Sequence, residues 1–429
     1  MPCAAMPGHR PEPPGQPQRR RLLLRLGALA GGVGALASAA CAAPAPAASS
    51  AAPVRRLACD DFDALWSSFA GTFLQPDGRV LDPDTEARVS TSEGQSYALF
   101  FALVADDRPR FDRVLQWTRQ NLCSGDFAAR LPAWQWGRQR DGRWGVLDAN
   151  AASDADLWLA WTLIEAARLW NAPALATDGR ALLARIRAEE VAEVPGLGTM
   201  LLPGPQGFVS EDRLQWRFNP SYAPLHVLRG LASADPGGPW TALAEQSART
   251  LAGMAPHGLA PDWATWSVQH SAPLRGRWTA DTQQGDTGSY DAIRCYLWAG
   301  VAPTDDPLKP ALLQGLAGMQ RHTRAATLPE RLATRAPASA DPASVARGTA
   351  PPGFTAALQP YLTALGDCAG AQHLAERLAA TCASGTRLRY YDHALALFST
   401  GWLQQRWRCD RHGRLQRTPT PSTPRCPTP

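Results

Sequence analysis

Helical segments that are apolar on nearly every face constrain the fold of this chain most. Examples are YALFFALVA at 97–105 and LWLAWTLIEAARLW at 157–170. A helix of this kind has to be surrounded by other elements. Between such segments lie amphipathic ones, such as RFDRVLQWTRQNL at 110–122, with apolar residues at three- and four-residue spacing. The alternation predicts an all-α fold with buried helices at the centre and amphipathic helices around them.

The connections between these helices are long and rich in Trp, Gly, Pro and Asp. Two of them span 131–154 and 260–289, and short strands are expected only within 198–204 and 208–218. Long loops in a compact domain usually carry function or are disordered. The many tryptophans favour ordered surfaces in the first two, whereas the Ala/Pro-rich segment 335–353 is typical of a flexible loop.

The two ends of the chain differ in composition from its body. Residues 1–43 combine a basic start, an apolar stretch and small residues, which is typical of an export signal. We expect residues 44–56 to form an Ala/Pro/Ser-rich linker, 57–415 the main folded domain, and 416–429 a flexible Pro/Thr tail. We expect a periplasmic or secreted protein, and Cys41 offers a lipid anchor as the alternative to simple cleavage.

Charge and cysteine content narrow the possible partners. The net charge is +5, and five arginines with one acid in residues 1–43 leave +1 for the remainder. A nearly neutral domain does not favour nucleic acid or anionic membranes. The absence of C-x-x-C pairs and of regularly spaced histidines predicts no metal site, and we expect no cofactor.

Seven cysteines follow the export signal. Disulfides are compatible with an oxidising compartment, and Cys59–Cys426 and Cys368–Cys382 are two candidate pairs. An odd number of cysteines leaves at least one free thiol. The order along the chain does not decide the connectivity.

Polar residues of catalytic type stand where the buried helices begin. Glu93, Asp154 and Asp291 each precede an apolar helix, and Tyr222 precedes another. Helix capping would explain any one of them, because such side chains satisfy free backbone N–H groups. It explains less well why the buried helices share the feature. If these helices run parallel, their acidic starts converge on one end of the domain.

Several strings resemble glycoside hydrolase family 8, and within it the periplasmic endoglucanases encoded with bacterial cellulose synthases. They are SEGQSYALFFALVADDRPRFD, LPAWQWG, VLDANAASDADLWLAW, EEVAEVPGLGTMLLPG, WRFNPSY, PDW, GSYDAIRCYLWAG and ALALFSTGW. They run in order through nearly all of the chain after the linker. The resemblance implies an (α/α)6 barrel, with six inner and six outer helices and a substrate cleft formed by long loops. It also implies hydrolysis of internal β-1,4-glucosidic bonds with inversion.

The resemblance assigns roles to individual residues. Glu93 matches the general acid, Asp291 the general base, and Asp154 an acid that grips the sugar at the cleavage point. The segment before Asp291 departs most from the family pattern. Further substrate-binding candidates are Tyr222, Arg294, Trp134 and Trp136.

The proposed acid and base need opposite environments. A helix N-terminus favours ionised Glu93, so its pKa has to be raised by repulsion from Asp154 and by partial burial. Arg294 lies one helical turn after Asp291 and can keep that carboxylate ionised.

The expected partners are β-1,4-glucan chains and the cellulose synthase export machinery, with the protein itself a monomer. One alternative is the same mechanism on xylan, chitosan or mixed-linkage glucan. A polysaccharide lyase is disfavoured because the chain has a single lysine, Lys309, and little net charge. A non-catalytic glycan-binding secretion factor would not need Glu93, Asp154 and Asp291 together.

Overall fold

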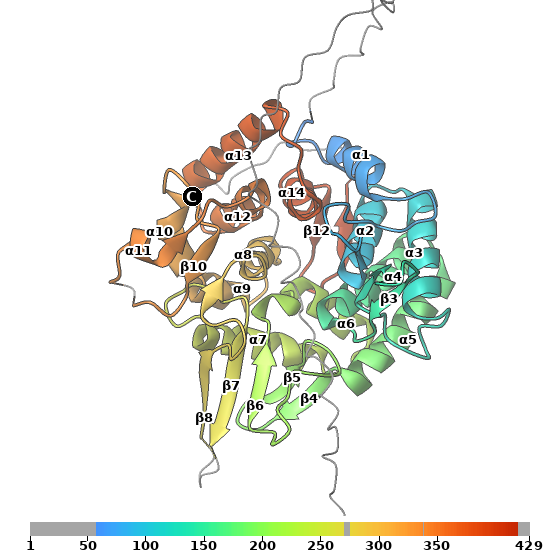
Figure 1. Ribbon diagram of the computed structural model, residues 1–429, viewed down its shortest axis with the longest axis horizontal. Helices are drawn as coiled ribbons and strands as arrows, with labels where there is room; N and C mark the ends of the chain where they lie inside the picture. The colour runs from blue at the N-terminus through green and yellow to red at the C-terminus, as the bar shows by residue number, and fades with distance from the viewer. Residues whose placement is uncertain (1–56, 270–274, 338, 419–429) are drawn as a thin grey trace, which may run out of the picture. The chain divides into compact units, whose positions relative to one another are not determined.

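The computed structural model describes residues 57–418 except 270–274 and 338. The predicted export signal, the linker and residues 419–429 lie outside this range. Buried helices occupy the centre, and Figure 1 shows other helices around them. The buried helices are α2 (Ser92–Val104), α4 (Ser153–Leu169), α6 (Leu225–Ala234), α8 (Ala292–Val301), α12 (Pro352–Ala364) and α14 (Tyr390–Leu403). Every residue of α8 and nearly every residue of α2 is buried, as their apolar sequences predict.

The amphipathic helices cover this centre. They are α1 (Phe62–Phe73), α3 (Arg108–Leu122), α5 (Pro173–Glu189), α7 (Trp240–Met254), α9 (Lys309–Gly315) and α13 (Cys368–Ala383). Most of them bury one face; α13, for example, buries Ala371, Leu374, Leu378 and Cys382, whereas the short α9 buries Lys309 alone. Buried and covering helices alternate along the chain, as predicted.

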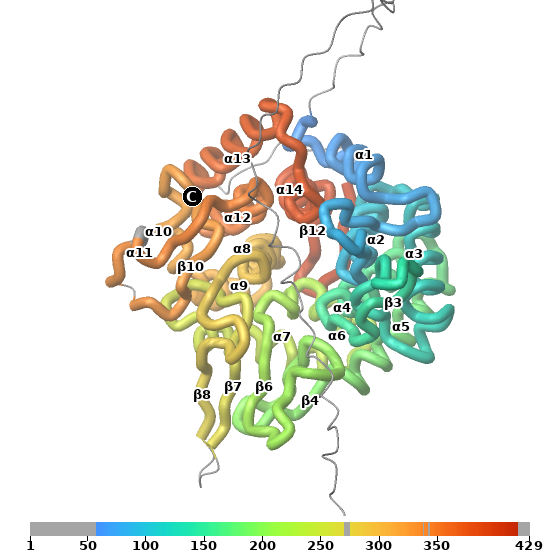
Figure 2. Tube along the Cα trace, viewed as in Figure 1, coloured from blue at the N-terminus to red at the C-terminus, as the bar shows by residue number. Residues whose placement is uncertain are grey.

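The chain travels once around the molecule. In Figure 2 the trace passes from blue through green and yellow to red around the centre. Among the buried helices, α2 packs against α4, α4 against α6, α8 against α12, and α12 against α14. The 3-10 turn η2 (Pro220–Tyr222) contacts α8, and α14 contacts both α1 and α2. The last buried helix thus meets the first, as in an α/α barrel.

Short strands and helical turns fill the connections. The strands are β1 (Ser90–Thr91), β2 (Gln135–Arg138), β3 (Trp144–Asp148), β4 (Val191–Val194), β5 (Gly198–Leu201), β6 (Gln215–Phe218), β7 (Ala264–Gln269), β8 (Arg275–Ala280), β9 (Thr287–Gly288), β10 (Arg331–Ala333), β11 (Ala346–Arg347), β12 (Trp407–Cys409) and β13 (Leu415–Arg417). The turns are η3 (Ala317–Met319), α10 (Gln320–Thr323) and α11 (Pro342–Val345). The strands expected within 198–204 and 208–218 are confirmed as β5 and β6. The domain is therefore mostly helical, and not all-α in its connections.

Tryptophans join three of these strands into a second small core. Trp216, Trp266 and Trp278 stand opposite one another on β6, β7 and β8. The first two belong to a cluster of buried residues, and Trp278 packs against it. Cross-strand aromatic pairs stabilise sheets. The described residues of the segment 260–289, expected to be a loop with an ordered surface, form β7, β8 and β9, and β7 pairs with both β6 and β8.

Two regions that the sequence predicts to be flexible contain regular structure. The flexible tail is predicted from 416 onward, but β13 pairs with β12 as far as Arg417. The Arg417 guanidinium donates to the carbonyl oxygen of Leu103 at 2.6 Å, so this end is anchored on α2. Most of the segment 335–353 is also described, and it contributes α11 and β11. The Pro and Ala content of these two segments predicted neither β13 nor the elements α11 and β11.

The disulfide pattern corrects both candidate pairings. Cys59, just before α1, is bonded to Cys382 near the end of α13, at a sequence separation of 323 residues. This excludes both Cys59–Cys426 and Cys368–Cys382. Cys368 is also disulfide-bonded. The expected free thiol is confirmed, because Cys123, Cys295 and Cys409 are buried and unpaired with other cysteines.

No helix within residues 57–418 is both long enough and apolar enough to span a bilayer.

Candidate active site

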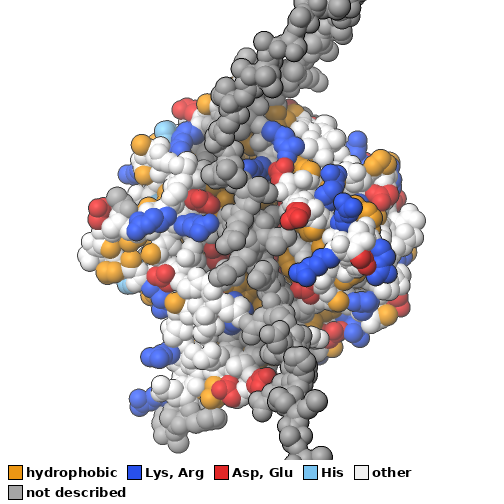
Figure 3. All heavy atoms as spheres, viewed as in Figure 1, with side chains coloured by type: hydrophobic (Ala, Val, Ile, Leu, Met, Phe, Trp, Pro, Cys, Tyr) orange, Lys and Arg blue, Asp and Glu red, His pale blue; other side chains and the backbone are white. Residues whose placement is uncertain are grey.

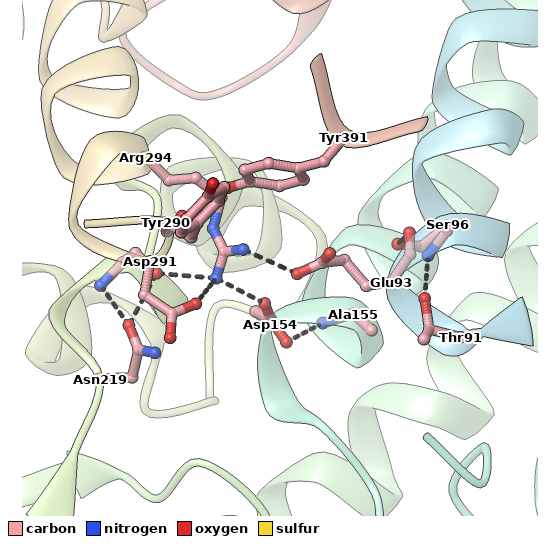
Figure 4. A network of polar contacts seen from close by, with 12 residues as sticks. Thr91, Glu93, Ser96, Asp154, Ala155, Asn219, Tyr290, Asp291, Arg294 and Tyr391 are labelled. Carbon is pink, nitrogen blue, oxygen red and sulfur yellow. Dashed lines mark hydrogen bonds and ion pairs between the residues drawn. The ribbon is translucent and has the colours of Figure 1, made fainter. Parts of the chain in front are cut away.

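The starts of three buried helices meet at one buried arginine. The guanidinium of Arg294, in α8, is fully buried. Its Nη1 donates to Glu93 Oε2 at 2.8 Å, and its Nη2 lies 3.3 Å from Asp154 Oδ2 and 3.2 Å from Asp291 Oδ1. Nη2 also donates to Ser221 Oγ at 2.9 Å. Figure 4 shows the carboxylates arranged around this group. The predicted convergence of Glu93, Asp154 and Asp291 is therefore confirmed.

Glu93 does not cap its own helix. The cap of α2 is Thr91, whose Oγ1 accepts from the backbone N–H of Gly94 at 3.0 Å. The Glu93 side chain is 13% exposed, against 3% for Asp154 and 5% for Asp291. Glu93 is thus the carboxylate of the three that solvent or a ligand reaches most easily. The capping explanation does not account for it.

Asp262 performs the capping that the sequence suggested for Asp291. Its Oδ1 accepts from the backbone N–H groups of Ser289, Asp291 and Ala292 at 2.8–2.9 Å. Its Oδ2 accepts from the Ser289 hydroxyl at 2.7 Å. The Asp291 side chain makes no capping hydrogen bond. Asp262 was missed because it lies 30 residues before Ala292, where the helix that it caps begins, although the PDW string contains it.

The Asp291 carboxylate is held on two sides instead. Its Oδ1 faces Arg294, and its Oδ2 accepts from Trp263 Nε1 at 3.1 Å. Trp263 in turn stacks on Phe208, with ring centroids 5.7 Å apart and planes 7° apart. The predicted pairing of Arg294 with Asp291 is confirmed, and the aromatic contact fixes the orientation further.

Asp154 is the most enclosed of the three acids. Its Oδ1 accepts from the backbone N–H of Ala155 at 2.9 Å, and its Oδ2 faces Arg294. Asp154 and Glu93 thus share one guanidinium, that of Arg294.

The electrostatics of Arg294 connect these groups. Burial lowers the pKa of this guanidinium, but nearby negative charge, that of Glu93 first, raises it well above its usual value. Burial and the charge of Glu93 likewise raise the pKa of the Tyr97 hydroxyl well above its usual value. The shortest contact of Arg294 is to Glu93, which the sequence analysis did not predict. A cation at this distance favours ionised Glu93, so it opposes the expected repulsion from Asp154.

Aromatic side chains form a wall beside the cluster. Tyr222 is buried, with its ring centroid 5.8 Å from Arg294 Cζ and 5.9 Å from the Trp263 ring. Tyr391 lies beside Arg294 in Figure 4, and its hydroxyl donates to the carbonyl oxygen of Tyr290 at 2.6 Å. Tyr391 comes from α14, far along the chain, and no motif around it predicted a place in the site.

The two tryptophans predicted to bind substrate, Trp134 and Trp136, lie in different surroundings. The carbonyl oxygen of Trp134 accepts from the N–H of Ser92 at 3.0 Å, at the start of the helix that carries Glu93. The Trp136 ring instead stacks on Trp144 and meets Trp117 of α3 edge-on. The structure therefore places Trp134 beside the cluster and the Trp136 ring against an outer helix.

The described part of the chain offers no group of three or more His, Cys, Asp and Glu side chains suited to a metal ion. On the face drawn in Figure 3, basic and acidic side chains are interspersed, without a dense patch of one sign. The cluster around Arg294 thus has the residues for acid–base chemistry by carboxylates.

Comparison with known proteins agrees with this chemistry. The model of glycosyl hydrolases family 8 matches residues 36–405. An endoglucanase of Xanthomonas axonopodis pv. citri (strain 306) is 47% identical, covering 95% of this chain and 98% of the relative. The crystal structure of an endo-1,4-D-glucanase from Vibrio fischeri ES114 is 37% identical, with a TM-score of 0.75, covering 82% of this chain and 98% of that one.

A more distant structure shares only the fold. A cold-adapted family 8 xylanase is 15% identical, with a TM-score of 0.60, covering 82% of this chain and 90% of its own. The same architecture thus occurs in a protein that is named for a different polymer, xylan. The match over most of the chain and the identity to full-length relatives together show that this chain belongs to glycosyl hydrolase family 8.

Proposed function

We propose that this protein is an endo-β-1,4-glucanase that cleaves internal bonds with inversion. The observation that carries the proposal is the convergence of Glu93, Asp154 and Asp291 on Arg294. The endoglucanase relatives support the choice of β-1,4-glucan as the polymer. We infer an (α/α)6 barrel, with α2, α4, α6, α8, α12 and α14 as its six inner helices.

Glu93 is the proposed general acid. Inverting glycosidases protonate the leaving oxygen with one carboxylic acid and activate water with a second carboxylate. One guanidinium contacts three carboxylates here, so full ionisation would leave excess negative charge in a buried site. Like-charge repulsion then favours a proton on one of them. Glu93 is the most exposed of the three and has the access that a proton donor needs.

Asp291 is the proposed general base. Arg294 and the Trp263 indole N–H both stabilise its ionised form and fix its direction. The guanidinium also stands between Asp291 and Glu93. An inverting mechanism needs roughly 6.5–9.5 Å between the two carboxyl groups, to leave room for water. A separating side chain is consistent with that requirement.

The remaining residues orient the sugar. Asp154 and Tyr222 adjoin Arg294 and would hold the sugar at the cleavage point. Trp134, whose backbone carbonyl contacts Ser92, would bind a neighbouring sugar. We extend the proposal to a monomeric enzyme that is exported through residues 1–43 and acts in the periplasm or outside the cell. Its substrate there is β-1,4-glucan, and its role is to support cellulose synthesis beside the export machinery.

The stereochemistry of the first product tests the mechanism. Proton NMR during hydrolysis of a cello-oligosaccharide should show the α-anomer before mutarotation. An initial β-anomer would refute inversion. Rates on carboxymethylcellulose, xylan and chitosan should be highest on carboxymethylcellulose, and a preference for xylan or chitosan would refute the choice of polymer.

A further inference from the structure

A hollow opens between the β2–β3 hairpin and the outer helix α3. Its volume is about 690 Å³. Its lining includes three tryptophans and three amide side chains: Trp117, Trp136, Trp144, Gln116, Gln120 and Asn121. None of the residues that contact Arg294 lines it. The hollow is therefore separate from the proposed catalytic cluster.

Trp144 is unusual among the residues that the structure describes. It is 47% exposed. No other large hydrophobic side chain among the described residues is as exposed to solvent. Trp144 stacks on Trp136, with ring centroids 5.5 Å apart and planes 18° apart. Trp136 meets Trp117 edge-on at 5.2 Å. The exposed face of Trp144 is thus a flat apolar surface that is available to a ligand.

Arg79 makes this aromatic surface rigid. Its Cζ lies 4.4 Å from the Trp136 ring centroid and 4.7 Å from that of Trp144. Arg79 is itself buried, donates to Ser90 Oγ at 2.7 Å and donates to the carbonyl oxygen of Arg88. Anchoring the hairpin explains the packing of Trp136 on Trp117. It does not require the exposed face of Trp144.

The amides supply the polar half of the surface. Gln116 and Gln120 are exposed and lie one helical turn apart on α3. A pyranose ring in a β-1,4-glucan has two apolar faces and a rim of equatorial hydroxyl groups. Flat indole rings match the faces, and amides donate to and accept from hydroxyl groups.

We propose that this hollow is a second glucan-binding surface, which holds a polymer chain against the enzyme outside the catalytic cluster. The inference rests on the proposed function for its choice of ligand. Its role is to retain long or insoluble glucan, so short oligosaccharides that fill only the catalytic cluster do not depend on it.

Binding to insoluble cellulose tests the proposal directly. The full chain carrying Glu93→Gln is used, to prevent digestion, and its retention is compared with and without Trp144→Ala. We expect roughly 3–10-fold weaker retention when Trp144 is removed, from the loss of one aromatic contact. Gln120→Ala, which leaves the aromatic stack intact, should weaken retention about twofold. Arg143→Ala is the matched control, because this neighbouring side chain is 79% exposed and pairs only with Asp141 in a salt bridge.

Hydrolysis of cellopentaose separates this inference from the proposed function. With Glu93 intact, Trp144→Ala should cleave cellopentaose with a kcat/KM within twofold of the unsubstituted enzyme. Equal retention of Trp144→Ala and Arg143→Ala would overturn the second surface. So would a parallel loss of cellopentaose cleavage, which would place Trp144 in the catalytic cleft. An unsubstituted protein that is retained on cellulose but cleaves no cello-oligosaccharide would refute only the catalytic proposal.

Discussion

Two sets of carboxylates stand at the starts of the inner helices and make different contacts. Glu93, Asp154 and Asp291 lie on their own helices and face Arg294. Asp262 and Asp392 lie outside the helices whose ends they satisfy. Asp262 accepts three backbone N–H groups at the start of α8, and Asp392 Oδ1 accepts from the N–H of Gly353 at the start of α12, at 2.9 Å.

The difference shows how capping and chemistry are divided. A carboxylate that caps a helix has its oxygens occupied by fixed N–H donors. Because Asp262 and Thr91 take over this task, the side chains of Asp291 and Glu93 can face the guanidinium. We call the first set the proposed catalytic set and the second the capping pair. The predictions below test whether this division holds.

The largest expected effect comes from the catalytic set. Glu93→Gln removes the proposed proton donor while keeping the shape of the side chain, and α2 keeps its Thr91 cap. We expect roughly 10²–10⁴-fold lower kcat on cello-oligosaccharides, with binding retained. Thermal unfolding of the variant serves as the control for folding. Turnover like that of the unsubstituted enzyme would remove Glu93 from the acid role.

Removing the shared cation should come next. Arg294→Met leaves two buried carboxylates and the partly exposed Glu93 without their guanidinium. Breaking a buried pair typically costs about 3–5 kcal/mol. Urea denaturation at neutral pH measures the loss. Arg143→Met is the control, because its partner Asp141 and its own side chain are exposed, and it should change stability by less than about 0.5 kcal/mol. Similar losses for both variants would contradict the central role of Arg294.

Asp262 offers a test at the boundary between the two sets. Asp262→Ala leaves three buried N–H donors at the start of α8 unsatisfied, at a cost of roughly 3 kcal/mol. Because those donors precede Asp291, kcat should fall more than KM changes. Asp262→Asn keeps an acceptor oxygen and should restore most of the kcat. If Asn and Ala behave alike, Asp262 does not position Asp291 through these hydrogen bonds.

The smallest expected effect is on stability and concerns Asp392. This effect depends on pH. Burial raises the pKa of this carboxyl to about 6, although hydrogen bonds from the Gly353 and Arg389 backbones lower it. The folded state therefore holds the proton more tightly than the unfolded chain. Ionisation costs folding free energy as the pH rises from about 4 through about 6.

Asp392→Asn isolates this titration. The amide still accepts from Gly353 but does not ionise, so the variant should match the unsubstituted enzyme near pH 4. By pH 7 it should be more stable by roughly 1–3 kcal/mol. Denaturation midpoints from pH 4 to 8 measure the difference. A stability difference that does not change with pH would show that the Asp392 pKa is not raised.

Local sequence patterns predicted much of the helical framework and the residues of the proposed catalytic set. The segments 97–105 and 157–170 could be identified as buried helices because apolar side chains cover nearly every face of each. Glu93, Asp154 and Asp291 could be chosen because each stands in the first turn of such a helix or just before it. Those relations span only a few residues, so a single sequence contains them.

Contacts between distant segments needed the tertiary structure. The Cys59–Cys382 bond joins residues 323 positions apart, and Arg294 contacts Glu93 across 201. The capping by Asp262, the Trp216–Trp266–Trp278 ladder and the hollow beside Trp144 are of the same kind. Each depends on which elements pack side by side, and no spacing within one segment encodes that choice. The sequence determined which helices carry the acids; the closing of the helices into one circuit decided that a single arginine serves all three.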